Sequence, residues 1–309
     1  MTHTDQISKL LEIKLIQAIS SERILGPNQL DTTRGLASVI WGTDRIESGR
    51  NFENNTMADG GTTTEIQTIY AITPTYSRLE QKADLIRLSQ TLMHVEHFHW
   101  VVVEDSNFKT ALVTNLLSES GLNFTHLNNI TPIEFQKGAL AGKSSRGVQQ
   151  RNAGLDWLRQ TLHHGENKGV VYFMDDDNTY DIRIFQEMRY TKRVSVWPVG
   201  LVGGAIYESP IVKNGKVTGW FTGWGPHREF AIDMAGFAVN LDLVHSHPNA
   251  RFSYSTKPGN LEGAILKAMG ADISHLEPKA NNCTQVLVWH TKTSKTELTT
   301  DKKLDNLEV

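Results

Sequence analysis

Cysteine is nearly absent from this sequence, since Cys283 is the only cysteine among its 309 residues. An intrachain disulfide is therefore excluded, but one cysteine does not assign the protein to an oxidising or a reducing compartment. The stretch NNCT around Cys283 favours a small buried side chain at this position over a reactive nucleophile.

A strong charge of one sign is also lacking, because the formal net charge is only −3. A basic field for nucleic acid and an acidic tail are therefore not expected. Long hydrophobic runs are missing as well: none reaches the roughly 18 residues of a membrane-spanning helix, and the N-terminus has no signal-peptide pattern. We therefore expect no nucleic-acid partner and no membrane anchor within this chain.

Several nucleotide- and metal-binding motifs are absent too. The first strand-like stretch is followed by ITPTYS rather than GxGxxG, and no GxxxxGK[ST] occurs, which argues against dinucleotide folds and P-loop proteins. The stretch DDDNTYD is not an EF-hand loop, because Tyr180 stands where the turn needs glycine. The histidines of HVEHFHW and HSH lack the HExxH spacing, so a zinc site is not expected.

Two dissimilar segments form the N-terminal part of the chain. Residues 1–25 place apolar side chains at helical spacing and mix both charge signs, which predicts an amphipathic helix or stem. Residues 26–65 are rich in Gly, Asn and Thr and have no hydrophobic period, which is typical of a linker or stem. The compact domain is expected to begin near Ile66.

Strand-like and helix-like segments alternate from that point. Such alternation predicts an α/β fold with a mostly parallel sheet and helices on both faces. Ligands of such sheets bind outside the carboxyl ends of the strands, where this chain places polar or aromatic side chains. The predicted strands are 66–74, 99–105, 123–128 and 169–174, and the predicted helices are 77–95, 109–121 and 146–162.

Three consecutive carboxylates, Asp175, Asp176 and Asp177, follow the apolar strand 169–174. A carboxylate cluster at a strand end suits a hard divalent cation that keeps positions open for phosphate oxygens. The alternative is that these residues cap a helix starting near Asp181, where negative charge favours the N-terminal dipole. Three carboxylates in a row favour the cation.

Seven stretches of the chain together resemble the inverting β1,3-glucuronyltransferases, over about residues 66–293. The resemblance implies a GT-A type glycosyltransferase fold in which residues 66–180 bind the UDP-sugar and residues 181–298 bind the acceptor, before a tail at 299–309. It also implies Mn²⁺, a homodimer and a Golgi location. The implied reaction transfers glucuronic acid from UDP-glucuronate to the 3-hydroxyl of a terminal galactose with inversion, as in the proteoglycan linkage region. The stretches are ITPTYSR, WVVVED, RGVQQRN, VVYFMDDDNTY, RVSVWPVGLVGG, AIDMAGFAVNL and LEPKANNCTQVLVWHT.

The donor site implied by the resemblance uses residues from four parts of the chain. Tyr76 would lie against the uracil ring and Asp105 would accept a hydrogen bond from it. Arg151 would hold the sugar carboxylate with a bidentate guanidinium. Asp177 would be the direct Mn²⁺ ligand. The remaining implied donor residues are Pro74, Thr75, Arg146, Asp175, Asp176, His290, Thr291 and Lys292.

The acceptor side and the base are implied in the same way. Glu208, Trp224, Arg228 and Asp233 match positions around the acceptor or the donor sugar, and Glu262 matches the catalytic base. Without the resemblance, Glu262 would be an ordinary glutamate at a helix start. Two departures from the family pattern occur: Lys292 stands where an arginine is usual, and Ala205-Ile206 stands where Leu-Arg is frequent.

Two alternatives remain at this point. A sugar nucleotidyltransferase also combines an α/β sheet with metal-binding carboxylates, but it would need a Gly-rich basic loop where ITPTYSR stands. A catalytically silent relative that only binds sugar nucleotides would retain much of the same site. The presence of both Glu262 and Asp177 argues against the silent relative.

Overall fold

The computed structural model describes residues 65–136 and 145–299. By its contacts the chain divides into Met1–Thr63 and Thr64–Val309, and every element below lies in the second unit. The predicted N-terminal helix (1–25) and nearly all of the predicted linker (26–65) and tail (299–309) lie outside the described residues. Within those two ranges, no helix is both long and apolar enough to cross a membrane.

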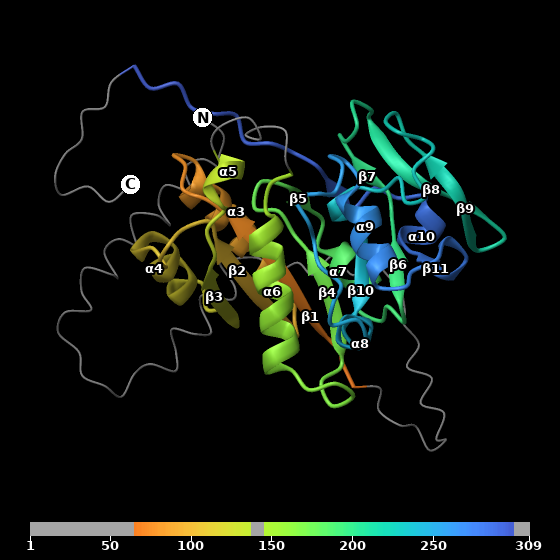
Figure 1. The fold of residues 1–309 in the computed structure, drawn as a ribbon, viewed down its shortest axis with the longest axis horizontal. Coiled ribbons are helices and arrows are strands. Elements are labelled where there is room, and N and C mark those ends of the chain that lie inside the picture. Colours follow the sequence, from red (N-terminus) through yellow and green to blue (C-terminus); the bar gives the residue numbers. More distant parts are fainter. Residues whose placement is uncertain (1–64, 137–144, 300–309) are drawn as a thin grey trace, which may run out of the picture. The chain divides into compact units, whose positions relative to one another are not determined.

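A seven-stranded sheet forms the centre of this unit, with the strand order β11-β6-β10-β4-β1-β2-β3 (Figure 1). β1 pairs in parallel with β2 and β4, and β2 pairs in parallel with β3. β10 is antiparallel to both of its neighbours, so the other strands all run in one direction. The strands are β1 (Thr68–Thr75), β2 (Phe98–Glu104), β3 (Phe124–Asn128), β4 (Gly169–Phe173), β6 (Val194–Val196), β10 (Phe237–Asn240) and β11 (Leu276–Pro278).

Helices cover both faces of this sheet, because successive side chains of a strand point to opposite faces. Along β1, Ile69 and Ala71 belong to one core with α3, α4 and α7, whereas Tyr70 and Ile72 belong to a second core with α6, α8 and α9. The predicted α/β fold with a mostly parallel sheet is therefore confirmed. The helices are α3 (Gln81–Leu92), α4 (Ala111–Glu119), α5 (Ile133–Gln136), α6 (Val148–Thr161), α7 (Arg183–Met188), α8 (Leu241–Ser246), α9 (Leu261–Ala268) and α10 (Ala280–Cys283), with 3₁₀ turns at Met234–Gly236 and Ile273–His275.

The observed helices are shorter than their hydrophobic patterns predict. The helix predicted for 77–95 spans only Gln81–Leu92, because the residues before it make the turn out of β1. The helix predicted for 109–121 starts after Thr110, whose side-chain oxygen accepts a hydrogen bond from the backbone of Val113 at 3.4 Å. The helical spacing of apolar residues thus continues beyond the last residues that make intrahelical hydrogen bonds, so it overestimates the length of each helix.

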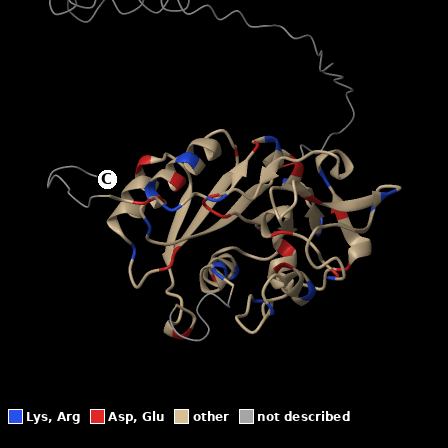
Figure 2. Cartoon of the chain, turned by 90° about the horizontal axis from the view of Figure 1, so that it is seen from above, with Lys and Arg blue, Asp and Glu red and all other residues tan. Residues whose placement is uncertain are grey.

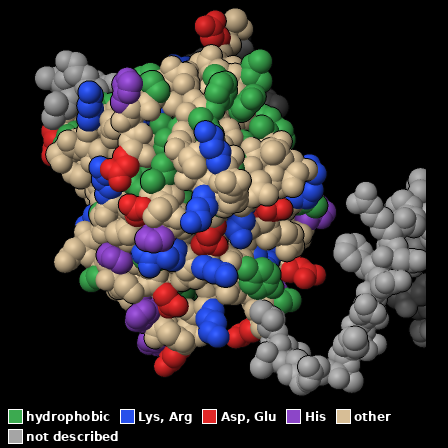
Figure 3. All heavy atoms as spheres, turned by 90° about the vertical axis from the view of Figure 1, so that its right-hand side faces the viewer, with side chains coloured by type: hydrophobic (Ala, Val, Ile, Leu, Met, Phe, Trp, Pro, Cys, Tyr) green, Lys and Arg blue, Asp and Glu red, His purple; other side chains and the backbone are tan. Residues whose placement is uncertain are grey.

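A second sheet of five strands has the order β5-β12-β7-β8-β9, and β7 to β9 lie on the right-hand side of Figure 1. Along β8, Tyr207 and Ile211 are exposed while Glu208 and Pro210 are buried, as the pleat requires. Figure 3 looks onto this side of the unit, where hydrophobic side chains gather near the upper edge. The strands are β5 (Thr179–Tyr180), β7 (Val199–Gly200), β8 (Tyr207–Lys213), β9 (Lys216–Phe221) and β12 (Val288–Trp289).

Helix α6 lies unusually close to β1 at Gly154. A Cβ atom added there would stand 2.6 Å from Cγ2 of Ile72, nearer than packed carbons can approach. This glycine therefore sets the depth at which α6 sits on the sheet. The helix carries Arg151 in its first turn, so its depth also places that side chain at the strand ends.

Gly154→Val is expected to lower the free energy of unfolding by about 1–3 kcal/mol, because the added methyl groups overpack the contact with Ile72. Urea denaturation measures the change. Gly219→Ala is the matched control, since a Cβ there meets nothing nearer than Cδ1 of Ile211 at 3.9 Å. Equal stability of the Gly154→Val protein and the control would contradict the close packing.

Candidate active site

A cavity of about 790 Å³ lies where the parallel strands β1, β2 and β4 end. This is the edge at which sheets of this kind bind ligands. Every residue predicted for the donor site lines the cavity except Thr291, and side chains of both charge signs meet there. Basic and acidic residues are likewise intermixed over the other described elements (Figure 2). The predicted residues in the lining are Pro74, Thr75, Tyr76, Asp105, Arg146, Arg151, Asp175, Asp176, Asp177, His290 and Lys292.

The loop after β1 presents an aromatic ring to the cavity. Tyr76 is 45% exposed, and the guanidinium carbon of Arg78 lies 4.7 Å from the centre of its ring. Arg78 also donates a hydrogen bond to the carbonyl oxygen of Tyr76 at 3.2 Å. One face of the ring is thus held by a cation, which orients the tyrosine at the cavity wall.

Asp105 follows β2 and is fixed by the next connection. Both of its carboxylate oxygens accept hydrogen bonds from Thr131, one from the backbone N–H and one from the hydroxyl, each at 2.7 Å. A carboxylate has about four lone-pair sites, so Asp105 can still accept a hydrogen bond from a ligand in the cavity. Thr131 also lines the cavity.

Arg151 reaches the cavity because its helix begins with a glycine. Gly147 precedes α6 with φ of 71°, and a Cβ there would lie 2.4 Å from Nη1 of Arg151. The guanidinium therefore folds back over Gly147 and donates to the carbonyl oxygen of Arg146 at 2.9 Å and to Oδ1 of Asp175 at 2.5 Å. Its Nε is buried and has no hydrogen-bond partner among the described residues.

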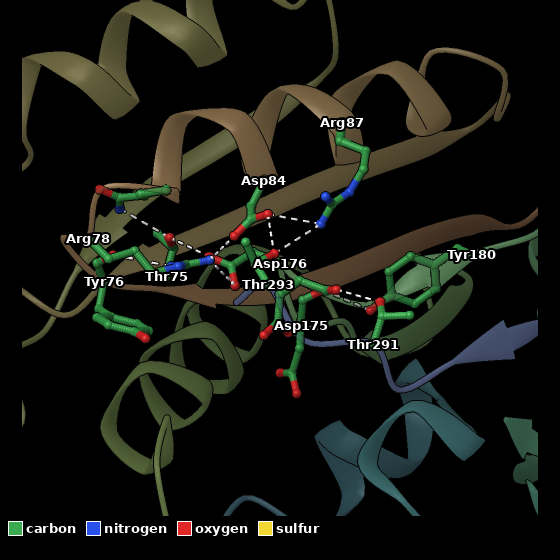
Figure 4. Close-up of polar contacts among 12 residues, drawn as sticks. Thr75, Tyr76, Arg78, Asp84, Arg87, Asp175, Asp176, Tyr180, Thr291 and Thr293 are labelled. Atoms are coloured by element: carbon green, nitrogen blue, oxygen red, sulfur yellow. Dashed lines mark hydrogen bonds and ion pairs between the residues drawn. The ribbon is translucent and has the colours of Figure 1, made fainter. Parts of the chain in front are cut away.

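The three aspartates after β4 have different surroundings. Asp175 pairs with Arg151, whereas Asp176 accepts a hydrogen bond from the hydroxyl of Thr75 at 2.7 Å and pairs with Arg78 at 2.9 Å (Figure 4). Burial raises the pKa of Asp176 to about 6, although Arg78 opposes the shift. The capping alternative does not describe these contacts, since both carboxylates face partners from other elements.

Asp177 differs from the other two aspartates in the partners of its carboxylate. Within the described ranges its carboxylate makes no hydrogen bond and no ion pair, and it lines the cavity. Burial, followed by the neighbouring charge of Asp175, raises its pKa. Residues 65–136 and 145–299 contain no group of three or more metal-ligating side chains. A divalent ion at Asp177 would therefore complete its coordination with ligand and water oxygens, a pattern that Mg²⁺-like cations accept beside phosphates.

The segment after β12 forms another wall of the cavity. His290 pairs through Nδ1 with Oδ2 of Asp233 at 3.1 Å, and this hydrogen bond raises the pKa of the imidazole. Lys292 lines the cavity. Thr291 points elsewhere, because its hydroxyl donates to the carbonyl oxygen of Asp177 at 2.6 Å. Thr291 therefore fixes the segment to the metal-binding candidate instead of lining the cavity.

Glu262 is the second residue of α9 and has a buried carboxylate atom. Its Oε2 has no hydrogen-bond partner among the described residues. Burial, and next the charge of Asp233, raises the pKa of Glu262 to about 7, while Arg151 and Arg228 partly oppose the shift. A carboxylate with a pKa near neutrality is well suited to accept a proton.

Trp224 and Arg228 form a stacked pair next to the loop that leads into α9. The guanidinium carbon of Arg228 lies 4.5 Å from the centre of the indole ring, and Nη1 of Arg228 donates to the carbonyl oxygen of Gly259 at 2.8 Å. Gly259 lies directly against the indole, since a Cβ there would overlap it. Trp224 is 47% exposed, so part of its indole can still contact a ligand beside the loop that leads into α9.

The other two predicted acceptor residues are more enclosed. Glu208 is buried and accepts a hydrogen bond from the hydroxyl of Thr222, and together with Asp233 it lines a second cavity of about 10 Å³. Asp233 also accepts a hydrogen bond from the backbone N–H of Ala235. Neither Glu262 nor any of the four predicted acceptor residues lines the large cavity.

Several residues at the cavity were not predicted from the sequence. Phe135 and Tyr254 stack with ring centres 3.8 Å apart, although 119 positions separate them and no local pattern pairs them. Two unpredicted residues lie outside the cavity lining and support it. Arg78 stands within the ITPTYSR stretch and could have been singled out by its position, whereas Asp84, which binds it, has the sequence pattern of an ordinary helical residue. The other unpredicted lining residues are Thr131, Gln136, Ser145, Gly147, Gln150 and Thr293.

Residues 88–294 match the model of Glycosyltransferase family 43. This chain belongs to glycosyltransferase family 43. The predicted identity as a glycosyltransferase, and hence as an enzyme, is confirmed by this membership. The sugar nucleotidyltransferase alternative is accordingly set aside.

The relatives in family 43 carry closely similar names. Human galactosylgalactosylxylosylprotein 3-beta-glucuronosyltransferase 2 is 51% identical over 249 residues, which cover 79% of this chain and 76% of the relative. Human galactosylgalactosylxylosylprotein 3-beta-glucuronosyltransferase 3 is 50% identical and covers 77% and 74%, and the human enzyme 1 is 50% identical and covers 77% and 72%. The resemblance to the β1,3-glucuronyltransferases is therefore confirmed.

Proposed function

We propose that this chain transfers glucuronic acid from UDP-glucuronate to the 3-hydroxyl of a terminal galactose, with inversion, in the glycosaminoglycan–protein linkage region. The observation that carries the proposal is the cavity at the strand ends, where neither the carboxylate of Asp177 nor the buried Nε of Arg151 has a partner in the part of the chain that the structure describes. The names and identities of the family 43 relatives support it. A Golgi location and a homodimer belong to the same proposal through the resemblance alone.

The donor occupies the large cavity in this proposal. The uracil ring stacks on Tyr76, whose exposed face and cationic backing suit a flat base, and Asp105 accepts a hydrogen bond from it. Asp175 and Asp176 hold sugar hydroxyls, with assistance from Thr75. The diphosphate lies toward His290 and Lys292, which supply positive charge.

A divalent cation, Mn²⁺ by the resemblance, would be held by Asp177. When bound it would offset the negative charge that develops on the leaving diphosphate. The chain's own contribution is the single half-buried carboxylate and the hydroxyl of Thr291, which fixes the backbone of Asp177 at 2.6 Å. Lys292 retains the charge that an arginine would bring but not the planar fork.

The acceptor galactose rests on Trp224 near Glu262. As the galactose 3-oxygen attacks C1 of the donor sugar, its proton passes to Glu262, and the C1–O bond breaks with its electron pair on UDP. A sugar hydroxyl is a weak acid, so removing the proton as the new bond forms lowers the barrier. The atom that takes the proton is Oε2 of Glu262, which has no hydrogen-bond partner within residues 65–136 and 145–299.

Arg151→Met is expected to abolish the preference for UDP-glucuronate over UDP-glucose, since the buried Nε would no longer meet the glucuronate carboxylate. A hydrogen bond to a charged group contributes about 1.5–3 kcal/mol, so the ratio of the two dissociation constants should fall by about 10–100-fold. Calorimetry with both donors measures it. Arg151→Met also removes the ion pair with Asp175, but this loss affects the binding of both donors equally and therefore cancels in the ratio of their dissociation constants.

Arg183→Met is the matched control, because it removes an exposed arginine paired with Asp181 away from the cavity. The control should keep the donor preference of the wild type. An unchanged preference in Arg151→Met would remove Arg151 from donor recognition.

The proposal as a whole is tested by UDP release. The protein is incubated with Mn²⁺, UDP-glucuronate and either galactose-terminated or glucose-terminated acceptors. We expect UDP release that depends on the galactose acceptor. A protein that binds UDP-glucuronate but releases no UDP with any acceptor would instead be the catalytically silent relative.

A further inference from the structure

Asp84 is a fully buried carboxylate that does not itself line the donor cavity. It lies in the first turn of α3, and both of its oxygens are occupied. Oδ2 accepts a hydrogen bond from Nη2 of Arg78 at 2.7 Å. Oδ1 accepts one from Nη2 of Arg87 at 2.9 Å and one from the hydroxyl of Thr293 at 2.6 Å (Figure 4). The wall residues of the cavity do not include Asp84.

The first of these contacts leads to the loop that follows β1. The same Nη2 of Arg78 that binds Asp84 lies 2.9 Å from Oδ1 of Asp176. The guanidinium also stacks on the ring of Tyr76. Arg78 therefore sits between two buried carboxylates and supports an aromatic wall of the cavity, and Asp84 fixes its position from behind.

The second contact leads to the other wall. We name residues 290–296 the strap; it contains His290, Lys292 and Thr293, all of which line the cavity. The strap is attached by Thr291 to the carbonyl oxygen of Asp177, by Thr293 to Asp84, and by the backbone N–H of Thr296 to Glu80 at 2.5 Å. His290, at the start of the strap, also pairs with Asp233. From Thr291 onward, the attachment at Asp84 is the one made by a fully buried carboxylate.

One carboxylate thus connects the loop after β1 with the strap, although Asp84 and Thr293 are 209 positions apart in the chain. A hydrogen bond to a charged, water-excluded carboxylate is stronger than a neutral one. Removing it leaves Arg78 paired with Asp176 alone, and it frees the strap between Thr291 and Thr296. Both changes disturb walls that a donor would touch.

We propose that Asp84 is a positioning residue for the sugar nucleotide, acting through Thr293 on the strap and through Arg78 on the loop after β1. This inference rests on the proposed function, since it takes the occupant of the cavity to be a uridine diphosphate sugar. It predicts that Asp84 controls donor affinity more than turnover, because Asp84 reaches neither the acceptor residues nor Glu262.

The test uses Asp84→Asn and Thr293→Val, both nearly isosteric, with Ser294→Ala as the matched control. Ser294 lies in the same strap and is exposed, and its side chain makes no hydrogen bond within the described residues. Binding of UDP in Mn²⁺ is measured by calorimetry, inhibition by uridine by competition, and KM and kcat with UDP-glucuronate by UDP release. Circular dichroism and thermal melting check the fold of each variant.

For Thr293→Val we expect the dissociation constant of UDP and the donor KM to rise by on the order of ten-fold. The kcat at saturation should stay within about three-fold, and inhibition by uridine should not change, because only the phosphate-facing wall is released. Asp84→Asn should weaken both UDP and uridine. The double variant should lose less than the sum of the two, since both substitutions break one contact.

Unchanged UDP affinity in Thr293→Val would overturn the proposal even if Asp84→Asn fails to fold. So would an equal loss in kcat at constant KM, or full additivity in the double variant. Failure of the proposed function would look different, because it would appear in the wild type itself, either as no binding of UDP in the presence of Mn²⁺ or as no UDP release with any acceptor.

Discussion

Replacing Glu262 with glutamine is expected to lower turnover by about 10²–10⁴-fold, the usual cost of removing a general base. Glutamine keeps the size of the side chain but cannot accept the galactose proton at neutral pH. Binding of UDP should be nearly normal, because Glu262 does not line the large cavity. Single-turnover and steady-state UDP release measure the loss.

The pH dependence of kcat gives a second test of Glu262 as the base. Glu262 must be ionised to act, and its pKa is about 7, so the kcat of the wild type should rise as pH increases through about 7 and then level off. The rise should be missing in Glu262→Gln. The charges that face Glu262 are those of Asp233, Arg151 and Arg228, and none of them changes in this variant.

Measurements of stability distinguish a loss of catalysis in Glu262→Gln from unfolding of the protein. A carboxyl whose pKa is raised in the folded state binds more protons when folded, so its contribution to stability falls as pH rises from the unfolded pKa toward 7. Glu262→Gln should therefore be at least as stable as the wild type at slightly alkaline pH. Glu229→Gln, which alters an exposed pair with Lys267, is the matched control. A Glu262→Gln protein that keeps more than about a tenth of wild-type turnover would exclude Glu262 as the base.

The second large effect is expected at Asp177. Asp177→Asn should reduce the Mn²⁺-dependent gain in UDP affinity by at least about 10–100-fold, because the described residues form no group of ligands around the proposed site that could compensate. Without metal, the variant should bind UDP as well as the wild type or better, since a negative charge facing the diphosphate has been removed. Calorimetry with and without Mn²⁺ measures both quantities.

Asp272→Asn provides the control for Asp177→Asn. Asp272 caps the 3₁₀ turn at Ile273–His275, where asparagine caps equally well, and it does not line the cavity. Its metal dependence should equal that of the wild type. If Asp177→Asn kept the full Mn²⁺-dependent affinity for UDP, the metal would have to be placed elsewhere.

The fold was predictable where hydrophobic periodicity is long and regular. The segments around β1, β2, β4, α3 and α6 each bury one face or both, so their patterns identify them. The reversed direction of β10 was not predictable, because strand direction depends on how the chain returns to the sheet and not on the strand itself. The two-residue strands β5, β7 and β12 are too short to show a period.

Some residues of the candidate site were likewise predictable from the sequence, and others were not. Tyr76, Asp105 and the aspartate triplet stand at strand ends, so the parallel sheet alone brings them to one edge. Glu262 has no such signal, and only the family resemblance singles it out. The pairs Asp84–Thr293 and Phe135–Tyr254 depend on distant parts of the chain meeting in space, which no local pattern encodes.

The proposed reaction is tested most directly by the structure of the product that the wild-type protein makes from UDP-glucuronate and a galactose-terminated acceptor in Mn²⁺. Nuclear magnetic resonance of that product gives both the linkage position and the anomeric configuration. We predict a single β-linked glucuronic acid on the galactose 3-oxygen. An α linkage, attachment to another oxygen, or free glucuronic acid as the only product would contradict it.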